Sequence, residues 1–75
     1  MTAPSDDESP EVPRYGDRVE HFAFGLCDVM TVREGRMKIR PVGGGNLKEI
    51  QVAAVRVLKP SERDGKRVFP LARRG

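Results

Sequence analysis

The sequence is poor in cysteine, histidine and aromatic residues, with one cysteine, one histidine, one tyrosine, three phenylalanines and no tryptophan. The single Cys27 cannot form a disulfide within the chain, which favours a reducing compartment. A structural zinc site built on His21 would need carboxylates for its remaining ligands, and such sites are rare. The chain therefore lacks two common means of stabilising a very small domain, and we expect neither a metal nor another cofactor.

Long apolar runs are also missing. No segment approaches the ~20 consecutive apolar residues that a membrane-spanning helix needs. The N-terminal residues 1–13 have neither the apolar stretch of a secretory signal nor the arginines of a transit peptide. We therefore expect a cytoplasmic protein without a membrane partner, and its 75 residues leave room for one domain with a small core.

Charge is divided unevenly along the chain. Residues 1–13 contain four acids and no base, whereas the remaining residues contain 14 basic and 7 acidic side chains. The acidic segment has three prolines and little apolar surface, so we expect a disordered arm, and one hypothesis is that it folds back onto the basic body. A basic body is typical of polyanion-binding proteins, although an ordinary solvated surface can have the same composition.

Short runs rich in β-branched residues alternate with glycine-containing turns from Tyr15 onward, which predicts β-strands. The clearest strand is 36–40, where strict alternation puts Met37 and Ile39 on one face and three bases on the other. We expect five strands, at 18–21, 26–33, 36–40, 47–52 and 55–58, with a 3₁₀ turn at 53–54. Residues 66–71 can add a sixth strand at an edge, after a turn or a single helical turn at 61–65.

A helix is the alternative for residues 47–58, because their apolar positions approximate helical spacing. Val52, Val55 and Val57 disfavour a helix and no N-cap precedes the run, so strands are the favoured interpretation. Curling these short antiparallel strands into a half-open barrel buries both halves of their apolar face. The predicted core consists of Val19, Phe24, Leu26, Val29, Val32, Met37, Ile39, Ile50, Val52, Val55 and Leu58.

We therefore predict an all-β fold, a small half-open barrel of the Tudor or Src-homology type. The disordered acidic arm covers residues 1–13 and the barrel covers residues 14–60. A basic C-terminal extension covers residues 61–75, of which 72–75 are expected to fray.

The order of residues is similar to that of a recurrent bacterial module. The shared positions are 15–21, Phe24, Gly25, Val29, Gly35, 37–39, 44–45, Ile50 and 55–58. They resemble the Tudor-like domain at the C-terminus of UvrD-type DNA helicases, and related barrels occur in transcription-repair coupling factor and in CarD-type regulators. Cys27 stands where that module has a second glycine. The resemblance implies an interaction module that contacts RNA polymerase and sometimes nucleic acid; it is an analogy, because fold alone does not fix function.

Three groups of residues could carry chemistry, and each has a simpler structural interpretation. His21 and Cys27 could form a catalytic dyad only with a third group to orient the base, and a turn histidine and a packed thiol are the favoured interpretation. Residues 43–48 lack the spacing and hydroxyl of a phosphate-binding loop and are expected to form a hairpin tip. Tyr15 and Phe22 could form one corner of a methyl-lysine cage, but aromatic residues are scarce.

A row of basic residues on one predicted strand is a more specific indication of function than these three groups. Alternation aims Arg36, Lys38 and Arg40 at one face, about 6.6–6.8 Å apart, close to the separation of successive phosphates along an extended strand. Arg33, Lys48 and Arg56 can extend the row on neighbouring strands, and Lys66 and Arg67 belong to the basic tail. An ordinary charged outer face, which protects a sheet from aggregation, is the alternative.

We therefore expect a non-catalytic interaction module. The leading hypothesis is a protein–protein adaptor of bacterial transcription or DNA repair, whose partner is RNA polymerase or a repair protein. The alternative is direct nucleic-acid binding through the basic row and tail. The chain is expected to be a monomer or a weak homo-oligomer.

Overall fold

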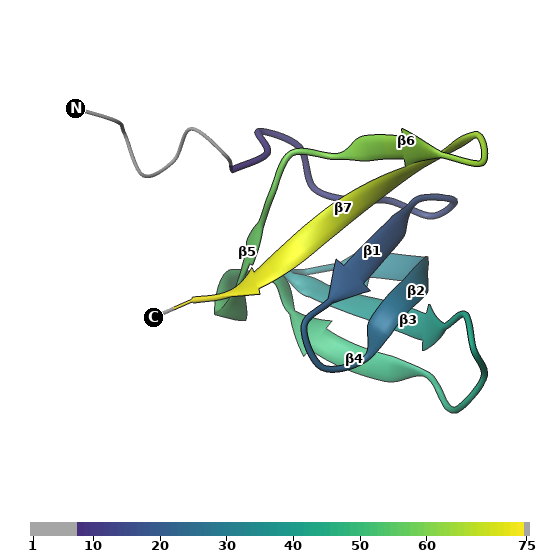
Figure 1. Cartoon of the computed structure of the whole chain (residues 1–75). Coiled ribbons are helices and arrows are strands. Elements are labelled where there is room, and N and C mark those ends of the chain that lie inside the picture. Colours follow the sequence, from purple (N-terminus) through teal and green to yellow (C-terminus); the bar gives the residue numbers. More distant parts are fainter. Residues whose placement is uncertain (1–7, 75) are drawn as a thin grey trace.

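Seven β-strands and one 3₁₀ turn make up the part of the chain that the computed structural model describes, residues 8–74 (Figure 1). The elements are β1 (Arg18–His21), β2 (Gly25–Arg33), β3 (Arg36–Pro41), β4 (Lys48–Gln51), η2 (Val52–Ala54), β5 (Val55–Val57), β6 (Ser61–Arg63) and β7 (Lys66–Arg73). The predicted all-β class is thus confirmed, and residues 47–58 form strands around a 3₁₀ turn instead of a helix. Among the described residues there is no helix of the length and apolarity that crossing a membrane requires.

The strands form one curled, open sheet in the order β4-β3-β2-β1-β7-β5, with β6 paired to β7. Strands β1 to β4 pair with their chain neighbours in antiparallel fashion. The half-barrel geometry agrees with the prediction, but the pairing of β1 with β7 is parallel, not antiparallel as expected. The chain passes from β4 to β5 through η2, where the Val52 N–H donates to the Gly35 carbonyl at 2.8 Å.

The C-terminal residues differ most from expectation. The sequence predicts a turn or a helical turn at residues 61–65, but they form β6 and the Asp64–Gly65 turn, in which both residues have positive φ. Strand β7 is no edge strand, because it pairs with β1, β5 and β6, and Figure 1 shows it beside β1. Residues 72 and 73 pair with β5 and are part of this strand. The physical reason is that Val68, Phe69 and Leu71 are buried, so residues 61–74 belong to the barrel.

The core differs from the predicted set mainly because it includes β7. Phe24 is predicted to be in the core, but it is 39% exposed, and Leu26 and Leu58 are only half-buried. Val32, Ile50 and Val52 are partly buried against the core. The buried cluster consists of Val19, Cys27, Val29, Met37, Ile39, Val55, Val57, Phe69 and Leu71.

A register shift between Val29 and Thr31 explains how β2 keeps two apolar residues on one side although they are three positions apart. Val29 lies opposite Ile39 and Val32 lies opposite Met37, so both face the interior. Met30 is the extra residue of this bulge, and a bulge reverses the inward and outward positions that follow it. Arg33 is thereby directed to the outer face of the sheet.

Residues 8–17 lie along β5 and β7, and we call this arrangement the N-terminal seam. The Ser9 N–H donates to the Val57 carbonyl at 2.8 Å, Glu8 forms a β-bridge with Leu58, and Pro13 is buried. For residues 8–13 the structure therefore differs from the disordered arm that the sequence predicts, since backbone hydrogen bonding and Pro13 burial attach them to the sheet. Residues 1–7 of the predicted arm lie outside the described residues.

Candidate functional site

The basic row on β3 lies where strand alternation predicts it. Arg36, Lys38 and Arg40 are exposed, whereas Met37 and Ile39 between them are completely buried. The buried pair anchors the strand to the core and holds the three cations outward. Neighbouring cations on one side of a strand are about 6.6–6.8 Å apart.

Arg33 completes the cluster, and we call Arg33, Arg36, Lys38 and Arg40 the basic face. Arg33 lies directly opposite Arg36 across the β2–β3 hairpin. Like charges in directly opposed positions destabilise a sheet, so this arrangement has a cost in folding free energy. Stability alone does not explain it.

Among the described residues, acids border the basic face without forming ion pairs with it. Glu34 and Glu49 line the groove beside Arg33, Arg36 and Lys38, and Asp28 lies opposite Arg40. Lys38 has Thr31 on one side and Glu49 on the other, and a shallow groove of about 250 Å³ runs beside them. Within residues 8–74, no ion pair joins any of the four cations to an acid. Their charge is therefore directed toward solvent.

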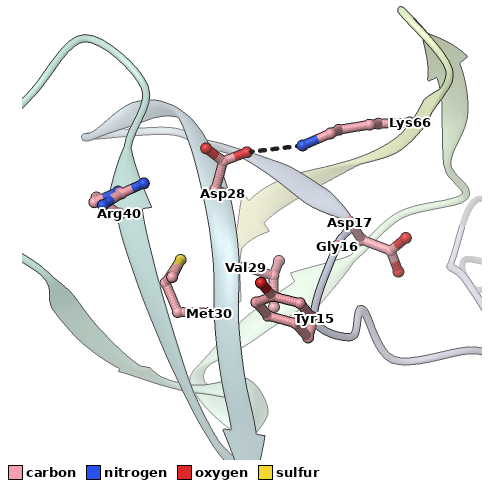
Figure 2. Close-up of a pocket in the computed structure, with 8 residues that line it drawn as sticks. All are labelled: Tyr15, Gly16, Asp17, Asp28, Val29, Met30, Arg40 and Lys66. Atoms are coloured by element: carbon pink, nitrogen blue, oxygen red, sulfur yellow. Dashed lines mark ion pairs between the residues drawn. The ribbon is translucent and has the colours of Figure 1, made fainter.

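A second groove, of about 190 Å³, adjoins the basic face at Arg40. Asp28 lies opposite both Arg18 and Arg40 in the strand register. It accepts a hydrogen bond from the Arg18 Nε at 2.8 Å and lies 3.8 Å from the Lys66 Nζ. Figure 2 shows Arg40 and Lys66 on either side of Asp28. One carboxylate thus holds Arg18 and Lys66 near it, and Arg40 stays outside these ion pairs.

Sequence reasoning gave no role to Met30 and considered Tyr15 only for a methyl-lysine cage, but both residues line this groove (Figure 2). Tyr15 is 77% exposed. The bulge in β2 places Met30 in the groove, and this irregularity could be inferred only from the odd spacing of Val29 and Val32.

Three predicted site residues do not belong to the basic face. Lys48 lies opposite the buried Ile39, so it faces the inner side of the sheet, and its Nζ is 5.3 Å from the centre of the Phe24 ring. Lys48 and Ile50 are two positions apart on β4, so their side chains point to the same side of the sheet. Because Ile50 is predicted to face inward, Lys48 faces inward too. Arg56 is half-buried on β5, at the opposite end of the strand order from β4.

Arg67 is the third predicted site residue outside the basic face, and its contacts stabilise the fold. Its guanidinium forms ion pairs with Glu11 and, at 3.0 Å, with Asp17, and it lies 5.1 Å from the centre of the Phe69 ring. Hydrogen bonds to Glu11 and then to Asp17 raise the pKa of Arg67. Arg67 therefore holds the N-terminal seam against β7. Lys66, which precedes it, remains beside the basic face through Asp28.

His21 and Cys27 do not act on each other. The His21 Nδ1 accepts hydrogen bonds from the backbone N–H groups of Ala23 at 2.9 Å and Phe24 at 3.3 Å. The Cys27 thiol donates to the Gly25 carbonyl at 3.5 Å. Burial, and then the charge of Asp28, raises the pKa of Cys27, which keeps the thiol protonated, whereas an active nucleophile needs the thiolate.

The other two candidate sites are not assembled either. Tyr15 precedes β1 and lines the groove of Figure 2, whereas Phe22 follows β1 and stacks on His21, so the two rings do not share a cage. No group of three potential metal ligands occurs in the described part of the chain. Residues 42–47 form the expected β3–β4 connection.

Comparison with known proteins gives no relative. No protein-family model matches the sequence, no curated protein aligns with it significantly, and no solved structure matches its fold significantly.

Proposed function

We propose that this chain is a non-catalytic interaction module that binds the phosphate backbone of nucleic acid through its basic face. The observation that supports this proposal is the outward row of Arg36, Lys38 and Arg40, with Arg33 beside it and no ion pair to an acid within residues 8–74. Extended single strands present phosphates at a spacing close to that of alternate residues in a β-strand. Cations at this spacing can neutralise successive phosphates and release their counterions.

Contacts to the backbone are expected to dominate over contacts to bases. Proteins that bind single strands through their bases use several stacking aromatic side chains. Here Tyr15, in the adjoining groove, is the one aromatic side chain near the basic face among the described residues. Binding is therefore expected to be tolerant of sequence and sensitive to salt.

The test compares two double variants with the same change in charge. Arg36→Gln/Lys38→Gln removes two cations of the basic face, and Lys59→Gln/Arg63→Gln removes one lysine and one arginine that are exposed elsewhere. Binding of a fluorescent oligothymidylate is measured by anisotropy over a range of salt concentrations. Because each phosphate contact on a single strand contributes about 0.7 to the salt slope, the first variant should lower that slope by ~1.4. Equal slopes and affinities for the two variants would contradict the proposal.

A protein–protein adaptor for bacterial transcription or DNA repair is the second candidate. It is favoured by the resemblance to the Tudor-like helicase domain and by the outer edge of β4, which pairs only with β3 among the described strands. An extended segment of a partner can add a strand to such an edge. Recovery of RNA polymerase subunits in a pull-down after nuclease treatment, with binding that persists at high salt, would favour this candidate over the first.

A further inference from the structure

An aromatic cluster at the β1–β2 connection forms a second surface, separate from the basic face. The imidazole of His21 lies between the rings of Phe22 and Phe24, with ring centres 4.2 Å and 4.4 Å away and interplanar angles of 28° and 22°. His21 is buried, but Phe22 is 46% and Phe24 is 39% exposed. We call these three residues the aromatic plug.

The plug is a fixed structure. Two backbone N–H groups of the connection, from Ala23 and Phe24, donate to the His21 Nδ1. These bonds need an unprotonated nitrogen, and burial followed by the charge of Arg73 lowers the pKa of His21. The imidazole is therefore neutral at pH 7, and its two faces are covered by the phenylalanine rings.

Two cations from distant parts of the sheet cover the plug. The Arg73 guanidinium of β7 lies 5.0 Å from the centre of the Phe22 ring, and the Lys48 ammonium of β4 lies 5.3 Å from the centre of the Phe24 ring. In the part of the chain that is described, neither cation forms an ion pair.

This geometry argues against the stacking of nucleobases. Each phenylalanine ring has one face on His21 and a cation over the ring, so the exposed fraction is mainly ring edge. The edge of an aromatic ring is the positive part of its quadrupole, which favours apolar and anionic neighbours. Two cations next to two exposed ring edges therefore fit carboxylates that flank an apolar side chain.

We propose that the aromatic plug, together with Lys48 and Arg73, docks an acidic peptide segment of a partner protein. Carboxylates of the segment pair with Lys48 and Arg73, and an apolar side chain between them contacts the phenylalanine edges. Charge complementarity selects this occupant. The site is independent of the basic face, so a single chain can hold an acidic protein segment and a nucleic-acid backbone at the same time.

The experiment uses a fluorescein-labelled ten-residue peptide in which Asp and Glu alternate with Leu. Two further peptides carry Lys in place of the acids or Ser in place of the leucines. The protein variants are Lys48→Glu/Arg73→Glu and, with the same change in charge, Lys59→Glu/Arg63→Glu, each checked for folding by circular dichroism.

We expect the Lys48→Glu/Arg73→Glu variant to bind the acidic peptide at least about tenfold more weakly than the control variant does, which corresponds to ~1.4 kcal/mol. The serine peptide should bind more weakly, and the lysine peptide should not bind. The inference would be overturned by an equal loss in both charge variants, or by no saturable binding up to about 1 mM. It would also be overturned if Lys48→Glu/Arg73→Glu lost affinity for oligothymidylate and kept its affinity for the acidic peptide.

Failure of the proposed function is distinguishable from failure of this inference. Arg36→Gln/Lys38→Gln should retain acidic-peptide binding whatever its effect on oligothymidylate. If that variant loses as much affinity for the acidic peptide as Lys48→Glu/Arg73→Glu does, peptide affinity depends on the overall charge of the protein. The proposed docking site would then be wrong.

Discussion

In the N-terminal seam Arg67 contacts Glu11, Asp17 and the ring of Phe69, whereas on the basic face Arg33 and Arg36 lie opposite each other and form no ion pair with an acid within residues 8–74. The seam arginine attaches an otherwise polar segment to the sheet. The arginines of the basic face repel each other and so lower stability. The comparison separates cations that hold the fold together from cations that form no ion pair within residues 8–74.

The largest expected effect is in the packing beneath the seam. Phe69 is completely buried, lies opposite Val19 in the parallel β1–β7 pair and supports Arg67. Phe69→Ala should cost ~3–5 kcal/mol of unfolding free energy, because it removes a large buried side chain and leaves a cavity. A core of this size rarely supplies more than about 3–5 kcal/mol, so the variant should be largely unfolded by circular dichroism. The control is the exposed Tyr15→Ala, and a folded Phe69→Ala protein would contradict the role given to β7.

The next prediction concerns Arg67 itself. Arg67→Ala should lower the Tm, by less than Phe69→Ala does, because Glu11 and Asp17 lose their partner and the seam loses an attachment to β7. Hydrogen exchange at Ser9, whose N–H donates to Val57, should become faster. Affinity for oligothymidylate should hardly change. A variant with an unchanged Tm and weakened oligothymidylate binding would place Arg67 in the binding surface, contrary to the comparison.

The smallest expected effect is a gain in stability, whereas the two variants above lose stability. Arg33→Glu replaces a like-charge pair with an attractive pair between the introduced carboxylate and Arg36, so unfolding free energy should rise by about 0.2–1 kcal/mol. Affinity for oligothymidylate should fall, because a cation of the basic face becomes an anion. Chemical denaturation and anisotropy measure the two quantities on the same sample. Loss of stability together with unchanged binding would remove the distinction between the two regions.

The hairpins were predictable from local sequence because each depends on alternation and a glycine turn. Residues 36–40 alternate without interruption, and Glu34–Gly35 is a two-residue turn in which both residues have positive φ. These features place Arg33 opposite Arg36, and the basic face follows from them. The bulge at Met30 was not predicted, because the sequence has no glycine there to mark it.

The position of β7 could not be predicted in the same way. Pro70 and a basic composition make residues 66–71 resemble a peripheral strand, but Val68, Phe69 and Leu71 are buried and β1 pairs with the strand in parallel. The aromatic plug was missed for a similar reason. Lys48 and Arg73 are far from Phe22 and Phe24 in the sequence, and only the curling of the sheet brings them over the rings.

The sequence by itself determined the all-β class, the three hairpins up to β4 and the outward direction of Arg36, Lys38 and Arg40, because strand periodicity and turn chemistry act between near neighbours. Tertiary structure alone decided that β7 lies beside β1, that Arg67 holds the seam and that Lys48 lies over the ring of Phe24. These outcomes depend on which apolar faces pack together when the sheet curls. Such packing brings residues that are distant in the sequence into contact, for example Arg67 and Asp17, which are separated by 50 positions.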